Sequence, residues 1–97
     1  MDIDRLVHEP ARFNIMASLY VVQSADCLFL QKQAGLTWGN LSSHLARLEA
    51  AGYIEVEKEF VGRKPHTMLH LTDDGRAAFD SYRQAMQKKL GNLPEAK

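Results

Sequence analysis

The chain has 97 residues, and its 12 basic and 12 acidic side chains give a formal net charge of zero at pH 7. This length forms one domain with a single modest core. Balanced charge argues against a protein that coats nucleic acid without discrimination, because such binding depends on excess positive charge. The acidic N-terminal residues lack the apolar stretch of a signal peptide, and no apolar run is long enough to span a bilayer, so we expect a cytoplasmic protein.

Two helices are predicted in the first part of the chain. Apolar residues recur between Asp2 and about Val22 in a pattern that favours a short helix followed by a longer one. Pro10 divides the two, because proline suits the first turn of a helix but not its interior.

A third helix is predicted from about residue 26 to residue 34. Its cap is either Ser24 or Asp26, and Gly35 is its stop. Cys27 is the single cysteine and has no partner for an intrachain disulfide, so it is either a small buried hydrophobic residue or a redox-active thiol. A tight turn at residues 35–37 then leads into the next helix.

The helix predicted over about residues 37–51 has an apolar stripe. Thr37 suits the N-cap position, and Gly52 suits the end of the helix, where a left-handed backbone is favoured. The stripe faces the core and consists of three leucines at helical spacing, namely Leu41, Leu45 and Leu48.

The other face of this helix carries side chains suited to a DNA groove. They are Trp38, Gly39, Asn40, Ser43, His44 and Arg47. Arginine pairs with guanine and asparagine with adenine, although the same residues on a surface helix are commonly only solvated. Trp38 either packs against the sugar-phosphate edge or covers the core. Because glycine weakens a helix by about 1 kcal/mol, either the helix starts after Trp38 or Gly39 allows close approach to DNA.

An alternating pattern after Gly52 predicts a β-hairpin at about residues 53–72. Ile54, Val56 and Phe60 fall on one side of the first strand, and glutamates occupy the other side. Leu69 and Leu71 are the core-facing pair of the returning strand.

The tip of this hairpin is basic. Arg63 and Lys64 stand between turn residues, where a short rigid turn presents both cations to phosphates, although charge at a hairpin tip also serves solubility alone. His66 follows on the outward side of the second strand and is included in the predicted contact set.

A last helix is predicted over about residues 73–91. Thr72 suits its cap, and two aspartates lie at the positive end of its dipole. Its apolar stripe is intrachain core or, as we expect from its length, a subunit interface. The stripe consists of Phe79, Tyr82, Met86 and Leu90.

The order of these elements and two sequence motifs resemble one family of proteins. The segment from Leu41 to Ile54, LSSHLARLEAAGYI, and the segment from Leu71 to Arg76, LTDDGR, resemble the MarR and ArsR superfamily of prokaryotic transcription factors, with the closer likeness to compact MarR-like regulators. The resemblance covers roughly residues 4 to 90. It implies a mainly helical α+β fold, a winged helix-turn-helix in which residues 1–97 form one domain.

What the resemblance implies about function is a homodimer on double-stranded DNA. Each subunit places the helix at about 37–51, here called the recognition helix, in the major groove, and its hairpin wing contacts the backbone or minor groove. We expect a sequence-specific regulator, most simply a repressor on a palindromic operator. The alternative is a winged-helix module that binds a partner protein, which the zero net charge and the three glutamates of the wing keep open.

No pattern for catalysis or metal binding is present in the sequence. Ser42, Ser43 and His44 are consecutive in one helix, so they do not form a nucleophile, base and orienting group. Four histidines invite a metal site, but a single cysteine and scattered carboxylates do not supply one. We therefore expect no enzyme activity, cofactor or metal, and the sequence does not identify a small-molecule effector.

Overall fold

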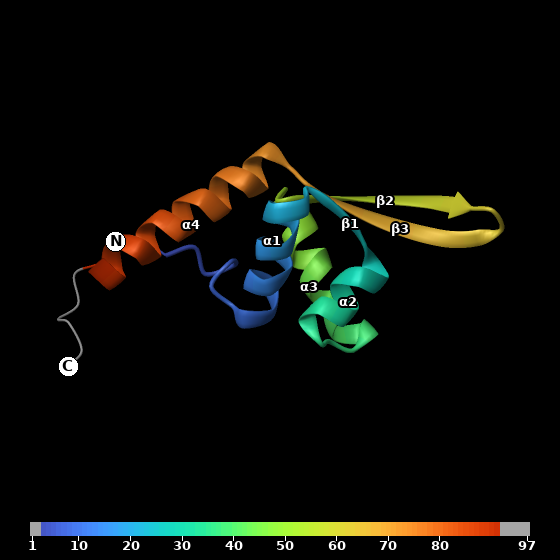
Figure 1. Ribbon diagram of the computed structural model, residues 1–97, viewed down its shortest axis with the longest axis horizontal. Coiled ribbons are helices and arrows are strands. Elements are labelled where there is room, and N and C mark those ends of the chain that lie inside the picture. The colour runs from blue at the N-terminus through green and yellow to red at the C-terminus, as the bar shows by residue number, and fades with distance from the viewer. Residues whose placement is uncertain (1–2, 92–97) are drawn as a thin grey trace.

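The computed structural model describes residues 3–91 and shows a helical body with a projecting hairpin at one end and a long helix at the other (Figure 1). Its dimensions are 56 × 27 × 21 Å. The elements are α1 (Pro10–Val22), β1 (Ser24–Asp26), α2 (Cys27–Ala34), α3 (Trp38–Ala50), β2 (Ile54–Val61), β3 (Lys64–Leu71) and α4 (Asp73–Gly91). The predicted winged-helix fold is confirmed. None of the helices within residues 3–91 is long and apolar enough to cross a membrane.

The segment before α1 is a turn, so the short first helix predicted there is wrong. The Asp4 carboxylate accepts the backbone N–H of Leu6 at 2.9 Å, as a cap does, but Glu9 before Pro10 is extended, so the chain between them forms only a turn. Val7 is nevertheless fully buried, which explains the apolar pattern. Pro10 then stands in the first turn of α1, and the Glu9 side chain caps that helix.

The helix-turn-helix is formed by α2 and α3, and its ends follow the predicted signals. The Asp26 carboxylate accepts the Phe29 N–H at 2.7 Å, which makes Asp26 the cap of α2. Gly35 ends α2 with a left-handed backbone, at a φ of 66°. Thr37 caps α3, which begins at Trp38, so the alternative of a later helix start is wrong.

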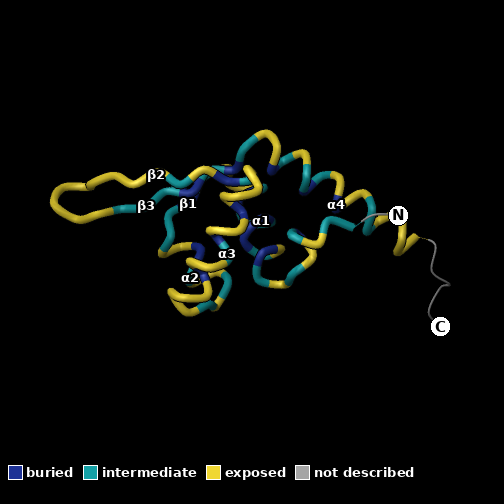
Figure 2. The backbone as a smooth tube through the Cα atoms, turned by 180° about the vertical axis from the view of Figure 1, so that it is seen from behind, coloured by how far each residue is buried: buried dark blue, intermediate teal, exposed yellow. Residues whose placement is uncertain are grey.

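The core lies where the three helices of the body meet the base of the sheet, and Figure 2 shows the buried residues gathered there. Leu41, Leu45 and Leu48 are at most 8% exposed, so the predicted leucine stripe is confirmed. The other buried hydrophobic residues are Val7, Ile15, Met16, Leu19, Ala25, Leu30, Ile54, Leu69, Leu71, Phe79 and Tyr82.

The sheet has three antiparallel strands in the order β1-β3-β2. The strand β1 was not predicted, because three residues are too few for a periodic signal. Gln23 ends α1 with a φ of 71°, and its backbone carbonyl accepts the Leu71 N–H at 2.9 Å. Its side-chain amide donates to the Leu71 carbonyl at 2.8 Å. These two bonds attach the end of α1 to β3 and direct the chain into β1.

The outer half of the β2–β3 hairpin leaves the core. Ile54, Leu69 and Leu71 are buried, as predicted for the core-facing side. Phe60 lies on the same side of its strand as Ile54, as predicted, but it is 75% exposed. Each strand has eight residues, and the helices cover only the part of the hairpin nearest the body (Figures 1 and 2). A residue on the core side of the alternation therefore reaches solvent near the tip.

The start of α4 is attached to the end of α3. Thr72 Oγ1 accepts the Gly75 N–H at 2.9 Å, so Thr72 caps the helix as predicted. The same hydroxyl donates to the Gly52 carbonyl at 2.6 Å. A Cβ at Gly75 would overlap the carbonyl oxygen of Tyr53, so the close approach of the two segments requires glycine at this position.

Candidate nucleic-acid interface

One face of α3 is fully presented to solvent. Every predicted contact residue of this helix except one is exposed, and the exposed set is Thr37, Trp38, Gly39, Asn40, Ser43 and Arg47. A Cβ placed on Gly39 would meet no atom within 4 Å, so its surface is open for close approach. The three leucines on the opposite side anchor the helix to the core and fix which face is exposed.

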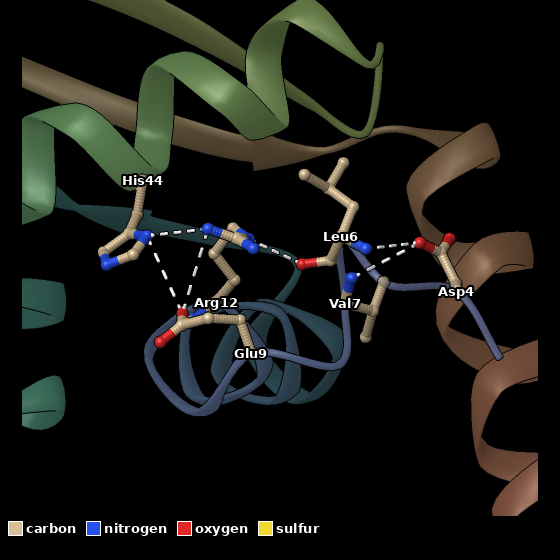
Figure 3. Close-up of polar contacts among 6 residues, drawn as sticks. All are labelled: Asp4, Leu6, Val7, Glu9, Arg12 and His44. Atoms are coloured by element: carbon tan, nitrogen blue, oxygen red, sulfur yellow. Dashed lines mark hydrogen bonds and ion pairs between the residues drawn. The ribbon is translucent and has the colours of Figure 1, made fainter.

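The exception is His44, which turns toward α1. Its imidazole Nδ1 accepts a hydrogen bond from an Arg12 Nη1 at 3.1 Å, and only 20% of the side chain is exposed. Figure 3 shows the Arg12 guanidinium between His44 and the carbonyl of Leu6, to which Arg12 Nε donates at 2.6 Å. His44 is therefore not included in the proposed DNA interface, because its ring is hydrogen-bonded to Arg12 inside the protein.

Glu9 completes this cluster. Its carboxylate accepts the Arg12 backbone N–H at 2.9 Å and lies 4.0 Å from the guanidinium (Figure 3). Burial acts to raise the pKa of Glu9, but hydrogen bonds from the N–H groups of Arg12 and Ala11, together with nearby positive charge, outweigh burial, so the pKa lies below its ordinary value. Because a guanidinium can only donate, His44 Nδ1 is the acceptor of the bond from Arg12. The distance of 3.7 Å from His44 Nδ1 to the Glu9 carboxylate is too long for a hydrogen bond.

This cluster was not predicted from the sequence. Arg12 is only 9% exposed, and an arginine in an otherwise apolar helix was not distinguished from a surface residue. The partners lie six and 32 residues away in the chain. The cluster joins the N-terminal turn, α1 and the recognition helix, and so fixes the direction of α3.

The tip of the wing presents its two cations without an acidic neighbour in the turn. Gly62 takes a φ of 66°, and Val61 pairs with Lys64, so the turn consists only of Gly62 and Arg63. Arg63 and Lys64 are both exposed. A narrow tip with two free cationic chains is suited to phosphate contacts.

His66 lies farther from the tip and has acidic neighbours. Its Nε2 is 3.5 Å from an Asp26 carboxylate oxygen, and its Nδ1 is 3.2 Å from Glu59. The two carboxylates lie beside the ring and repel phosphate, so His66 is not included in the proposed interface either. Among residues 3–91, no three His, Cys, Asp or Glu side chains are grouped closely enough to hold a metal ion.

A hollow of about 510 Å³ separates the start of α3 from the wing. Trp38 is 53% exposed and lines it, so of the two alternatives for this residue, covering the core is excluded. The other lining residues are Asp26, Cys27, Leu28, Pro65, His66 and Thr67. Burial, with the Asp26 charge as a second cause, raises the pKa of the Cys27 thiol, which favours the unreactive protonated form.

The stripe of α4 divides into two parts. Phe79 and Tyr82 are buried within the chain, where the Phe79 ring lies 5.1 Å from that of Tyr20, so these two belong mainly to the intrachain core. Met86 is half-buried and Leu90 is 60% exposed. Together they border an apolar groove of about 260 Å³, whose other lining residues are Phe13, Phe79, Tyr82, Arg83 and Gln87.

The fold and this surface define the class of the protein. A family model described as a winged helix DNA-binding domain matches residues 11–90, so the chain belongs to that family. Among known proteins, it is 32% identical over 78 residues to the uncharacterized protein MJ0432 of Methanocaldococcus jannaschii, a match that covers 80% of this chain and 85% of that one.

Solved structures give the same result for the fold. The chain is similar to a transcriptional regulator homologue from Pyrococcus horikoshii OT3, with a TM-score of 0.88, 27% identity and coverage of 95% of this chain and 91% of that one. It is also similar to reduced AbfR bound to DNA, a Staphylococcus epidermidis protein, with a TM-score of 0.71, 19% identity and coverage of 87% and 58%. NadR and AbfR, two of the structural neighbours, are MarR-family transcriptional regulators, and together with the family match they confirm the predicted resemblance.

Proposed function

We propose that this protein is a homodimeric regulator that recognises a specific DNA operator through α3 and the β2–β3 wing. The observation that carries the proposal is the hollow between them: Trp38 at the start of α3 and Pro65 and Thr67 of the wing border the same space. The recognition helix and the wing therefore lie on the same side of the molecule, where one binding partner can contact both. A DNA duplex has both features that this arrangement needs, a groove for a helix and phosphates beside it.

The roles of the exposed side chains follow from their chemistry. Arg47 reads a guanine edge, Asn40 an adenine edge, and Ser43 either a base edge or a phosphate. Thr37 and Gly39 bring the start of the helix close to the backbone. Arg63 and Lys64 bind phosphates at the wing, where they orient the protein but do not select a sequence.

The dimer forms through the C-terminal half of α4. Leu90 and Met86 border an apolar groove beside Phe13, and a second copy covers this surface. A two-fold dimer presents its recognition helices to successive major grooves about 34 Å apart, so the operator is an imperfect palindrome. Occupation of a promoter by such a dimer represses transcription without any further activity.

Selection of bound duplexes from a random pool tests this function. The wild-type protein is expected to enrich a palindromic motif, and its affinity for that motif is expected to fall by orders of magnitude as salt rises. If no motif is enriched at moderate salt, specific DNA recognition is wrong. The wing glutamates Glu55, Glu57 and Glu59, all exposed, would then favour the alternative of a protein-binding module, whose affinity changes far less with salt.

A further inference from the structure

The tip of the wing carries an exposed aromatic side chain that the proposed contacts do not use. Phe60 is 75% exposed, the highest value of any aromatic residue among those the structure describes. It pairs across the hairpin with Pro65, which is also exposed. A large apolar side chain exposed on a narrow projecting element is unfavourable in water unless a partner covers it.

The two faces of the outer hairpin differ in charge. Side chains alternate along a strand, so Lys58 and Phe60 share one face with Thr67 and Pro65, their partners across the hairpin. We call this the Phe60 face, and it carries no acidic residue beyond the base of the hairpin. The opposite face carries the exposed glutamates of β2, at positions 55, 57 and 59, together with Val61. Across the hairpin it also carries His70, Met68 and His66 and, next to the turn, Lys64.

This difference decides which face turns toward DNA. Glutamate carboxylates repel phosphates, so the face that carries them points away from the duplex. The Phe60 face bears a lysine, and two of its members, Pro65 and Thr67, border the hollow that Trp38 borders from α3. From the opposite face only His66 reaches this hollow, and none of the three glutamates lines it. The Phe60 face and the start of the recognition helix therefore border the same hollow.

We infer that Phe60, supported by Pro65, is an apolar contact that packs against deoxyribose in the minor groove beside the phosphates held by Arg63 and Lys64. This inference rests on the proposed function. The sugar walls of the minor groove are the apolar surface nearest to phosphates, and architectural DNA-binding proteins place phenylalanine and proline in this groove. The cations at the tip supply the charge complementarity that selects DNA as the occupant of this face over an uncharged partner.

The test compares variants of Phe60 with Val61→Ala, a matched control on the opposite face of the same tip that is 60% exposed in the native protein. Affinity for the selected duplex is measured over a range of salt, and hydroxyl-radical cleavage reports which deoxyriboses the protein covers. Phe60→Ala is expected to bind about tenfold more weakly at every salt concentration, since the apolar area that the phenyl ring buries on binding is lost. The slope of log affinity against log salt stays unchanged, because no cation is removed.

Two further readouts are expected if the inference is correct. Phe60→Ala loses protection of the deoxyriboses beside the wing but keeps protection around the recognition helix. Phe60→Leu recovers most of the affinity, because it restores apolar surface at the same position. Val61→Ala binds and protects as the wild type does.

The contrary outcomes separate this inference from the proposed function. If the wild type binds its selected duplex and Phe60→Ala binds and protects equally well, the inference is overturned and the proposed function stands. If Phe60→Ala changes only self-association in sedimentation, the tip contacts a second copy and the inference is again overturned. If the wild type selects no duplex, both are wrong.

Discussion

Replacement of Arg12 by methionine tests whether the buried cluster holds the recognition helix. Methionine keeps the apolar length of the side chain but removes its donors, so the Leu6 carbonyl and His44 Nδ1 lose their hydrogen bonds. Each buried acceptor left without a donor costs about 1–3 kcal/mol. Two such groups together would cost about 2–6 kcal/mol. Since the His44 ring is partly exposed and water reaches it, we expect a total loss in the lower half of that range, about 2–4 kcal/mol.

For a domain of this size, a loss of that magnitude lowers the melting temperature by about 10–20 °C. Thermal and urea unfolding followed by circular dichroism measure it. The control is Arg5→Met, since Arg5 is an exposed arginine of the same N-terminal segment and its loss is expected to change stability by less than about 0.5 kcal/mol. Equal unfolding curves for the two variants would refute the structural role of Arg12.

Three further predictions concern pH, DNA and assembly. A hydrogen bond from the Tyr53 hydroxyl to the Asp4 carboxylate, with burial as a second cause, raises the pKa of Tyr53 to about 12 from an ordinary value of 10.0. The stability that this hydrogen bond contributes is therefore present below pH 10 and lost as pH rises to about 12. Tyr53→Phe is expected to remove this loss when unfolding is measured at alkaline pH. Arg47→Ala relaxes base preference at one operator position in a repeated selection, whereas Arg63→Ala with Lys64→Ala weakens all duplexes alike and flattens the salt slope. Leu90→Glu gives a monomer in sedimentation, and an unchanged dimer excludes α4 as the interface.

The features that the sequence predicted correctly are those with a local physical cause. The helix caps at Asp26, Thr37 and Thr72 depend on a side chain and a backbone N–H three residues away, and all three are present. Burial of the leucine stripe depends on helical period alone. The failure before α1 also has a local cause, since Pro10 disfavours helical backbone at Glu9 and leaves only a turn between Asp4 and Glu9.

The features that the sequence did not predict depend on distant parts of the chain. Alternation assigned Phe60 to the core side of its strand, but it contains no information on where the helices stop covering the hairpin. His44 lies near the polar side of α3 by period, and only the position of Arg12 shows that its ring turns inward. The set of exposed contact residues is therefore smaller than the set that helical spacing predicted.

The most direct test of the central claim is the ratio of affinities for the selected duplex and for a scrambled duplex of the same composition, measured at about 0.15 M salt. A specific reader that uses both α3 and the wing is expected to prefer its operator by a factor of about 10³ or more. The double replacement of Arg63 and Lys64 by alanine is expected to lower both affinities and keep most of that preference. A ratio close to one for the wild-type protein would contradict the account.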